Sequence, residues 1–324
     1  MILLNNLIKE QNSPPFMFMM CGLPGSGKST FAKTITVSKN HITLPPKIHS
    51  SDAIRKELYG DESLQIDHNK VFALLHKRII EDLRAGRDVV YDATNINKKQ
   101  RIHFLNKLKD INCVPYAVVM AVPFSDCLNR NNLRDRCVPE KAIKRMYMNW
   151  EPPHEGEGFH HVNYVFPDDV TYDNYTLGQF ADDAKNFDQE NKHHSMTLGE
   201  HCDKTAEYIL QNKPDNFMLY VAAKLHDNGK IFTKTRVNRK GIDDGNCHYY
   251  QHQNTGSYDS MFYVKNITNQ NAAKITYVAN LIYYHMHPYI QWKQSERCAK
   301  RDKALLGDLY NDVLLLHEAD ANAH

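Results

Sequence analysis

The sequence predicts two domains of different fold class: an α/β domain with a parallel sheet flanked by helices, followed by an all-α domain. Three observations lead to this prediction. The chain has 324 residues, more than one compact α/β domain usually needs. Short apolar runs alternate with helix-like segments as far as Trp150, as in a sheet with crossover helices. Beyond about Asn186 only helix-like segments follow.

The N-terminal domain, residues 1–168, is expected to alternate strands with helices. It starts with the apolar run Phe16–Cys21, then glycine-rich sequence, then helix-like residues 29–37, which is a strand, loop and helix order. The other expected strands are 88–91 and 114–122, and the other expected helices are 69–85, 98–110 and 140–150. This order predicts a parallel sheet.

The domain boundary is expected after Trp150. Residues 146–184 contain no Lys or Arg but several acidic residues, and prolines interrupt any helix there. We therefore expect a linker at 169–190 and a C-terminal domain at 191–324. The helices expected in that domain are 197–211, 216–226, 272–285 and 305–323.

Composition narrows the class of protein. A hydrophobic content of 42% with 24% charged residues is typical of globular proteins and excludes a disordered chain. The longest apolar run, 116–122, is too short for a bilayer, and no signal-like N-terminus is present, so we expect a cytoplasmic protein. Seven cysteines without paired spacing indicate reduced thiols. A net charge of +2 means that any nucleic-acid binding must be local.

Residues 22–29, with the sequence GLPGSGKS, fit the P-loop pattern between an expected strand and an expected helix. Glycines let backbone N–H groups close on phosphate oxygens, and the helix N-terminus adds its partial positive charge. In such a loop Lys28 reaches the β- and γ-phosphates and Ser29 ligates Mg²⁺. The residues expected to bind ATP and Mg²⁺ are Gly22, Gly25, Ser26, Gly27, Lys28, Ser29 and Thr30.

A P-loop alone does not choose between kinase, ATPase and GTPase, so the acceptor-side residues decide. Asp52 and Arg55 lie one helical turn apart and face the same side. Asp92 follows the strand 88–91, where ligand sites of α/β folds gather. Three arginines precede Pro139 on an expected basic lid: Arg130, Arg134 and Arg136.

Over residues 16–166 these motifs resemble the phage-type polynucleotide 5′-kinase family. The resemblance implies that Asp52 is the general base on the 5′-OH and that Arg55 contacts the acceptor's phosphate. It also implies that Asp92 orients acceptor-side groups and that Arg134 stabilises the transferring phosphoryl group. We count Arg130 and Arg136 with the cofactor-binding residues. Phosphoryl transfer depends on such positioning and charge neutralisation.

Histidine is abundant, with 18 residues, and several recur at wide intervals in the C-terminal part. His226 and Asp227 are adjacent and close an apolar helix, with Gly229 as its expected C-cap. His287 lies beside His285 and could replace it as a ligand. The full set of candidate metal ligands is His201, His226, Asp227, His252, His285 and Asp320.

This pattern resembles the HD phosphohydrolase superfamily over residues 194–324. The resemblance implies two divalent transition metal ions such as Mn²⁺, because mononuclear members do without the equivalents of His252 and His285. Asp227 could bridge the two ions, and Lys230 is expected to contact a phosphate. A two-metal site activates water and clamps both oxygens of a phosphoester.

Together the two patterns resemble bifunctional end-healing enzymes, a family with mainly the opposite domain order. We expect phosphorylation of the 5′-OH ends of RNA, or of DNA, and removal of 2′,3′-cyclic phosphate or of 2′- or 3′-phosphate. An RNA ligase is the expected later partner. Two alternatives stay open: a small-molecule or nucleotide kinase fused to an HD nucleotide phosphohydrolase, and a kinase with a regulatory HD module. The oligomeric state is not predicted.

Overall fold

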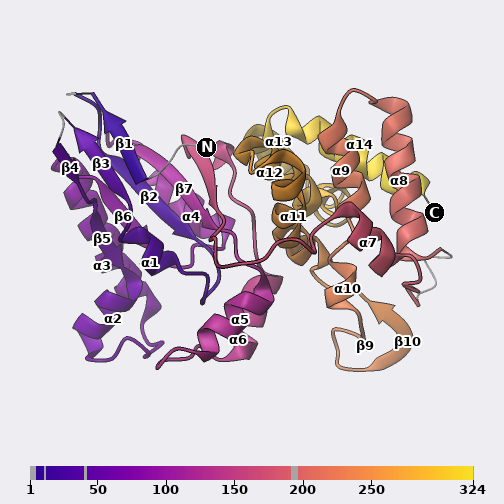
Figure 1. The fold of residues 1–324 in the computed structure, drawn as a ribbon, viewed down its shortest axis with the longest axis horizontal. Coiled ribbons are helices and arrows are strands. Elements are labelled where there is room, and N and C mark those ends of the chain that lie inside the picture. Colours follow the sequence, from indigo (N-terminus) through magenta and orange to yellow (C-terminus); the bar gives the residue numbers. More distant parts are fainter. Residues whose placement is uncertain (1–4, 11, 40–41, 191–195, 324) are drawn as a thin grey trace. The chain divides into compact units, whose positions relative to one another are not determined.

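The computed structural model describes residues 5–10, 12–39, 42–190 and 196–323. It divides into two compact units: unit 1 contains residues 1–143 and 157–170, and unit 2 contains residues 144–156 and 171–324 (Figure 1). Most of the expected linker 169–190 therefore belongs to unit 2. The expected start of the C-terminal domain, residue 191, lies outside the described residues, as do His194 and His324 at the ends of the HD resemblance.

Unit 1 is built on a five-stranded parallel sheet with the order β5-β6-β2-β7-β8. Its strands are β2 (Phe16–Cys21), β5 (Lys47–Ser50), β6 (Val89–Asp92), β7 (Val114–Met120) and β8 (His161–Val165). Every residue of the central strand β2 is buried, because helices cover both faces of such a sheet. The predicted parallel sheet flanked by helices is confirmed.

The helices of this part of the chain are α1 (Lys28–Ala32), α2 (Ser51–Tyr59), α3 (His68–Arg84), α4 (Lys98–Asn106), α5 (Phe124–Asn132) and α6 (Glu140–Met148). Side chains of Ser50 and Asn97 cap α2 and α4 by accepting backbone N–H bonds. The expected helix 29–37 is wrong in its second half, because α1 ends at Ala32. The β-branched run 34–37 instead leads into β3 (Thr36–Lys39), which pairs with β1 (Asn5–Lys9) and β4 (Ile42–Leu44).

Unit 2 is a helical body in which α8 packs against α9 and α14, and α12 packs against α9 and α11. Its α-helices are α7 (Leu177–Ala184), α8 (Leu198–Asn212), α9 (Phe217–Leu225), α10 (Lys230–Thr233), α11 (His252–Thr268), α12 (Ala272–Tyr284), α13 (Glu296–Leu306) and α14 (Leu309–Asn322). A 3-10 helix, η1 (Glu155–Glu157), and a π-helix, η2 (Pro288–Trp292), accompany them. The helices expected at 197–211, 216–226 and 272–285 correspond to α8, α9 and α12.

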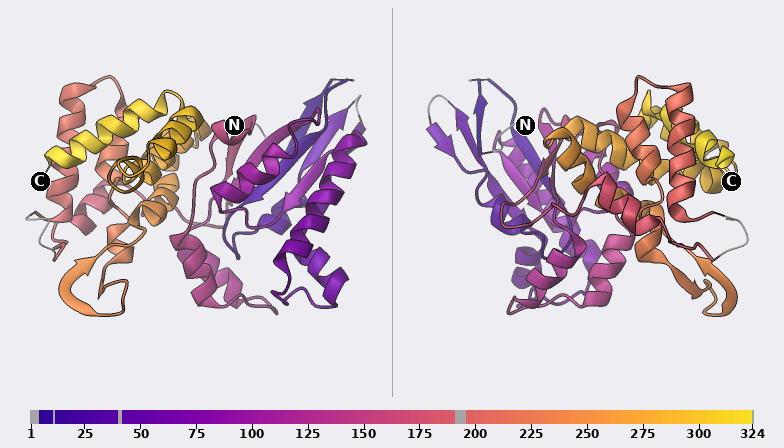
Figure 2. Two further views of the ribbon diagram at one scale, coloured as in Figure 1. Left: turned by 180° about the vertical axis from the view of Figure 1, so that it is seen from behind. Right: turned by 45° about the vertical axis from the view of Figure 1, so that its right-hand side comes forward.

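Unit 2 departs from the expected all-α pattern. A β-hairpin, β9 (Thr235–Val237) with β10 (Asp243–His248), follows α10 and projects from the helices in two further views (Figure 2). The helix α11 was not predicted, because its small and polar residues give no apolar period although most of them are buried. The expected helix 305–323 is interrupted at Gly307, which has a φ of 56°.

Residues 144–156, which we call the strap, belong to unit 2 although unit 1 precedes and follows them in the sequence. Trp150 is fully buried, and its carbonyl accepts a bond of 2.8 Å from Asn254 of α11. The Tyr147 hydroxyl donates to the Asp259 carboxyl at 2.6 Å. Burial raises the pKa of Asp259 to about 7, against the effect of that bond. The strap is therefore part of the helical core.

None of the seven cysteines, all of which lie in the described ranges, forms a disulfide. Among the helices in the described ranges, none combines the length and the apolar character that a bilayer crossing requires.

Candidate functional sites

The loop between β2 and α1 forms the first candidate site. Gly22, Gly25 and Gly27 have φ values of 149°, 84° and 85°, which glycine adopts at little cost. A Cβ on Gly25 would lie 2.1 Å from the carbonyl oxygen of Cys127, so the loop also packs closely on α5. Glycine at these positions permits the turn that directs backbone N–H groups at a phosphate.

Lys28 supplies the positive charge of this loop. It is buried, and its Nζ donates to the carbonyl of Leu23 at 2.7 Å and to the Ser26 hydroxyl at 3.4 Å. Burial lowers the pKa of Lys28; the charge of Asp92 opposes this effect, whereas the charge of Arg134 reinforces it.

The carboxyl ends of β5, β6 and β2 meet at one edge of the sheet because these strands are adjacent and parallel. Asp92, the last residue of β6, accepts a hydrogen bond of 2.7 Å from the Ser29 hydroxyl. A P-loop hydroxyl beside a carboxylate is the pair that holds Mg²⁺ in P-loop enzymes. The acceptor-orienting role expected of Asp92 stays a prediction.

Asp52 lies near the start of α2 at the same edge. Its side chain is 51% exposed, and one oxygen accepts from Arg55 Nη1 at 2.7 Å. The second oxygen lies 3.4 Å from Arg136 Nη1, which also pairs with Glu62 at 3.1 Å. Two guanidinium groups thus orient a carboxylate that solvent can reach. This geometry places Arg136 beside Asp52, and its expected role in nucleotide binding stays a prediction.

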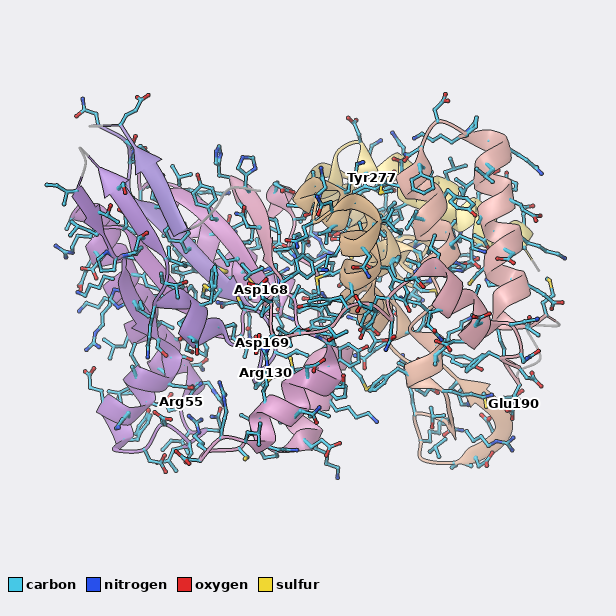
Figure 3. The ribbon with its side chains drawn as sticks, in the orientation of Figure 1. Arg55, Arg130, Asp168, Asp169, Glu190 and Tyr277 are labelled. Carbon is cyan, nitrogen blue, oxygen red and sulfur yellow. The ribbon has the colours of Figure 1, made fainter. Side chains whose placement is uncertain are left out.

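The other two arginines of the expected lid lie in α5 and in the segment directly after it. Arg130, in α5, pairs with Asp169 at 2.6 Å (Figure 3). Its Nη1 would be 3.9 Å from a Cβ on Gly27. Arg134 is exposed in the turn after α5 and affects the pKa of Lys28. The roles expected of Arg130 and Arg134 toward a nucleotide stay predictions.

The second candidate site is a buried cluster in unit 2. Its ligand atoms form two groups, each with all atoms within 4.8 Å of one another: His201, His226 and Asp320 in one group, and Asp227, His252 and His285 in the other. The residues come from α8, the end of α9, the start of α11, the end of α12, and α14. The helical fold therefore brings together all six residues that the sequence singled out as metal ligands.

Three histidines of the cluster are oriented by the same local bond. The Nδ1 atoms of His226, His252 and His285 lie 2.8, 2.8 and 2.6 Å from the carbonyl oxygen three residues earlier. Because a carbonyl only accepts, Nδ1 carries a proton and Nε2 is the ring nitrogen that faces the cluster. The Nε2 atoms of His252 and His285 are 3.2 Å apart, as are those of His201 and His226. Facing imidazole nitrogens and carboxylates fit divalent transition metal ions.

Asp227 faces both groups. Its Oδ1 is 3.1 Å from His252 Nε2 and 3.8 Å from His285 Nε2, and its Oδ2 is 3.5 Å from His201 Nε2 and 3.4 Å from His226 Nε2. Burial acts to raise the pKa of Asp227, but the neighbouring positive charges outweigh it and hold that pKa well below its usual range. One ionised carboxylate therefore offers one oxygen to each group.

The structure separates His285 from His287. His285 lies in the cluster, whereas the ring of His287 packs 4.5 Å from that of Tyr284 and 6.1 Å from that of Trp292. Burial and the neighbouring histidines lower the pKa of His285 to about 3. Its imidazole is therefore neutral and able to act as a ligand.

Lys230, the expected phosphate contact, is buried beside the cluster. Its Nζ lies 2.6 Å from Asp227 Oδ2 and 2.7 Å from Gln189 Oε1. Gln189 is fully buried, and sequence reasoning missed it because no motif marks this glutamine in the expected linker. Its contact with Lys230 helps to fix the position of the ammonium group.

Gly229 has a different role from the expected C-cap. Its φ of −66° is an ordinary helical value, and the residue that caps α9 is His226. A Cβ on Gly229 would lie 2.1 Å from the carbonyl oxygen of His252. The C-cap prediction is wrong, and close packing on α11 explains the glycine.

Comparisons with known proteins bear on the N-terminal part. Residues 17–153 match a family model described as an AAA domain. L-seryl-tRNA(Sec) kinase of Methanococcus maripaludis is 27% identical over 143 residues, covering 42% of this chain and 53% of that kinase. Transcription factor bHLH140 of Arabidopsis thaliana is 25% identical over 169 residues, covering 50% of this chain and 17% of that protein. This chain thus spans about half of the one relative and less of the other.

A structural similarity was found to a chain of the Pnkp1/Rnl/Hen1 RNA repair complex. It covers 43% of this chain and 45% of that chain with 20% identity and a TM-score of 0.36. A TM-score this low does not establish a shared fold. Residues beyond 153, which include the whole histidine cluster, lie outside the family match.

Proposed function

We propose that this chain, whose unit 1 contains a kinase-like P-loop domain, phosphorylates the 5′-OH ends of RNA and removes phosphate from 2′,3′ ends. The kinase half depends on Asp52, an accessible carboxylate at the sheet edge that carries the P-loop. The phosphoesterase half depends on Asp227, whose two oxygens face two groups of ligand atoms.

In the proposed kinase reaction, the phosphates of ATP lie on the P-loop and Lys28 neutralises part of their charge. Ser29 and Asp92 would hold Mg²⁺, which neutralises more of it. Asp52 takes the proton of the 5′-OH as that oxygen attacks the γ-phosphorus, and ADP leaves. Arg134 stabilises the charge on the transferring phosphoryl group. The two side chains proposed to hold Mg²⁺, Ser29 and Asp92, already lie in contact.

A polynucleotide acceptor explains the surroundings of Asp52 better than a small metabolite does. Arg55 and Arg136 present guanidinium groups there, and such groups pair well with phosphate oxygens. The first nucleotide of a strand with a 5′-OH carries a 3′-phosphate that Arg55 can bind. An acceptor without a phosphate could not make this contact.

In the proposed phosphoesterase, the two groups of cluster residues would hold two divalent ions such as Mn²⁺. Those ions would supply an activated water and neutralise charge on a phosphoester. The protein contributes imidazoles fixed by their Nδ1 bonds and the shared carboxylate of Asp227. Lys230 adds a positive charge at the side of the cluster where the phosphate arrives.

Broken RNA removes a conflict between the two activities. A kinase and a phosphoesterase acting on one small metabolite would consume ATP in a futile cycle. On a broken strand the kinase acts on the 5′ side and the phosphoesterase on the 3′ side. The healed ends, 5′-phosphate and 3′-OH, are substrates for an RNA ligase, the expected partner.

The test is to incubate the purified protein with an RNA that carries a 5′-OH and a 2′,3′-cyclic phosphate, together with ATP and Mg²⁺ or Mn²⁺. Mapping both ends should reveal a 5′-phosphate and loss of the cyclic phosphate. Omitting ATP should prevent only the first change, and a chelator should prevent both. A protein that phosphorylates nucleosides or sugars but no RNA end would contradict the kinase half.

A further inference from the structure

The hairpin β9–β10 is inserted between two of the cluster residues, Asp227 and His252, in the sequence. Contacts with Glu190 fix the base of the hairpin. Glu190 accepts from Lys234 at 2.7 Å and also pairs with Arg236, while its carbonyl accepts from the backbone N–H of Cys247 at 2.8 Å. These contacts hold the hairpin in a defined place on the helical body.

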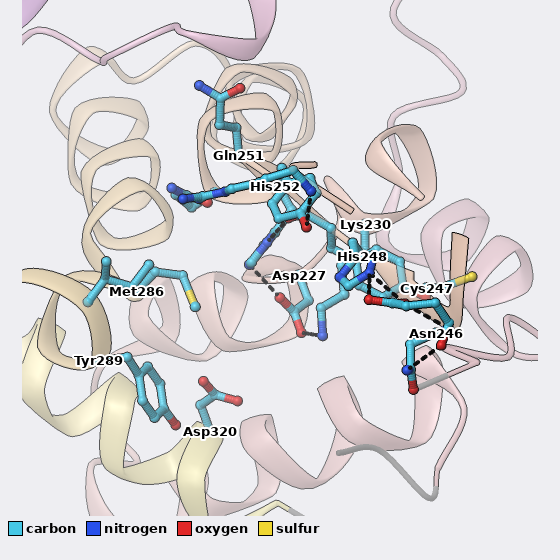
Figure 4. Close-up of a pocket in the computed structure, with 16 residues that line it drawn as sticks. Asp227, Lys230, Asn246, Cys247, His248, Gln251, His252, Met286, Tyr289 and Asp320 are labelled. Carbon is cyan, nitrogen blue, oxygen red and sulfur yellow. Dashed lines mark hydrogen bonds and ion pairs between the residues drawn. The ribbon is translucent and has the colours of Figure 1, made fainter. Parts of the chain in front are cut away.

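A cavity of about 700 Å³ lies between this hairpin and the cluster. Asp227, His252 and Asp320 line one part of it, and hairpin residues line another. Figure 4 shows His248 on the hairpin side and Tyr289 on the opposite side, near Asp320. The volume lies within the range of roughly 300–1,000 Å³ that small-molecule sites occupy and exceeds what a phosphate ion alone needs.

The hairpin side of the cavity carries a preformed group of planar side chains. The Arg239 guanidinium lies over the Tyr250 ring, 5.0 Å from its centroid. The rings of His248 and Tyr250 are nearly parallel, with an interplanar angle of 6° and centroids 5.3 Å apart. Asp244 binds His248 Nε2 at 3.0 Å, and the Tyr250 hydroxyl accepts from the Arg239 backbone N–H at 3.2 Å. We call Arg239, His248 and Tyr250 the stacking group.

We propose that this cavity binds the terminal nucleotide of the strand to be healed, with its phosphate at the cluster and its base against the stacking group. The inference rests on the proposed phosphoesterase and names the part of the substrate that the protein recognises. Planar aromatic and guanidinium groups stack on any nucleobase, whereas a phosphate alone would gain nothing from them. The stacking group therefore acts in substrate recognition.

The experiment compares a substrate with a base and one without. The full chain with Mn²⁺, in a Lys28→Ala background that weakens nucleotide binding at the P-loop, is assayed on 2′,3′-cyclic AMP and on methyl riboside 2′,3′-cyclic phosphate, which has the same cyclic phosphodiester but no base. Arg239→Ala and Tyr250→Ala should raise the KM for cyclic AMP by roughly 10- to 100-fold and leave the other substrate unchanged. Tyr250→Phe should keep most of the affinity. Lys240→Ala, a change of an exposed charge in the same hairpin, is the matched control and should change neither rate.

Equal effects on both substrates, or no effect on cyclic AMP, would overturn the inference while leaving the phosphoesterase intact. If the protein hydrolyses neither substrate, the proposed phosphoesterase fails, and the inference is then tested by binding alone. The binding of adenosine 3′-monophosphate is measured by calorimetry in the same Lys28→Ala background. The inference stands if Arg239→Ala and Tyr250→Ala weaken this binding, and it fails if binding is unchanged or absent.

Discussion

In unit 1 the phosphate-binding residues are consecutive, from Gly22 to Thr30, whereas in unit 2 the cluster residues are spread from His201 to Asp320. The two sites also differ in exposure: the side chain of Asp52 is 51% exposed and that of Asp227 only 4%. A loop whose turn is set by its own glycines needs only a strand and a helix around it. The cluster needs five packed segments at once. We therefore expect substitutions to act locally in unit 1 and on folding as well as chemistry in unit 2.

The largest effect is expected for Asp227→Ala, which should remove the bound transition metal and the phosphoesterase activity together. The reason is that this carboxylate faces both groups of ligand atoms, and its loss also leaves buried positive charges unpaired. Metal analysis and end mapping measure the result. Asp203→Ala, an exposed aspartate on α8, is the control. A variant that kept its metal, or that also lost kinase activity, would break the contrast between the two sites.

The next effects concern the kinase. Asp52→Asn should lower the rate at saturating ATP by about 10²–10⁴-fold, because a general base is lost, while ATP affinity and the unfolding midpoint stay near wild type. Lys28→Ala should abolish phosphorylation and weaken ATP binding. Rates and ATP dissociation constants separate the two variants. If Asp52→Asn weakens ATP binding as severely while its saturated rate survives, the base assignment is wrong.

Arg134→Ala should slow phosphoryl transfer by about 10²–10³-fold, with little change in the KM for an RNA acceptor. Its proposed partner is charge that develops on the phosphoryl group during transfer. Lys141→Ala removes an exposed charge on α6 and is the control, which should change neither the rate of phosphoryl transfer nor the KM for the RNA acceptor. A pure loss of acceptor affinity in the Arg134 variant would move this residue to the RNA-binding surface.

The same contrast explains what could be predicted from sequence. The P-loop and the strands β2, β6 and β7 were predicted because a contiguous motif and apolar runs carry their own signal. The cluster residues were identified only through a family resemblance, since nothing in their spacing reveals that distant helices meet. The helix α11 and Gln189 were missed because small polar residues and a lone glutamine have no periodicity. Their burial is decided by tertiary packing, which the sequence does not display.

The smallest effect concerns stability and pH. Burial raises the pKa of Asp259 to about 7. In the unfolded chain the same carboxyl ionises at a pH of about 4. Its protonated form therefore stabilises the folded chain, and this stabilisation is lost as the pH rises from about 4 to about 7. Between pH 5 and pH 8 the free energy of unfolding of the wild-type chain should fall by about 2–3 kcal/mol more than that of Asp259→Asn. Urea unfolding at both pH values measures this. Asp215→Asn, on the surface, should behave as wild type, and equal pH dependence in both variants would show that Asp259 does not govern it.

The strap restricts how this protein can have evolved. It precedes β8, an edge strand of the sheet in unit 1, yet Trp150 and its neighbours complete the helical core of unit 2. A simple end-to-end gene fusion would keep each partner's residues together on one side of the junction. In this chain, a crossover before the strap would separate β8 from the rest of unit 1. A crossover after the strap would separate Trp150 and its neighbours from the core of unit 2. The two halves are therefore expected to be inherited as one unit, with their substitutions selected jointly rather than shuffled as independent parts.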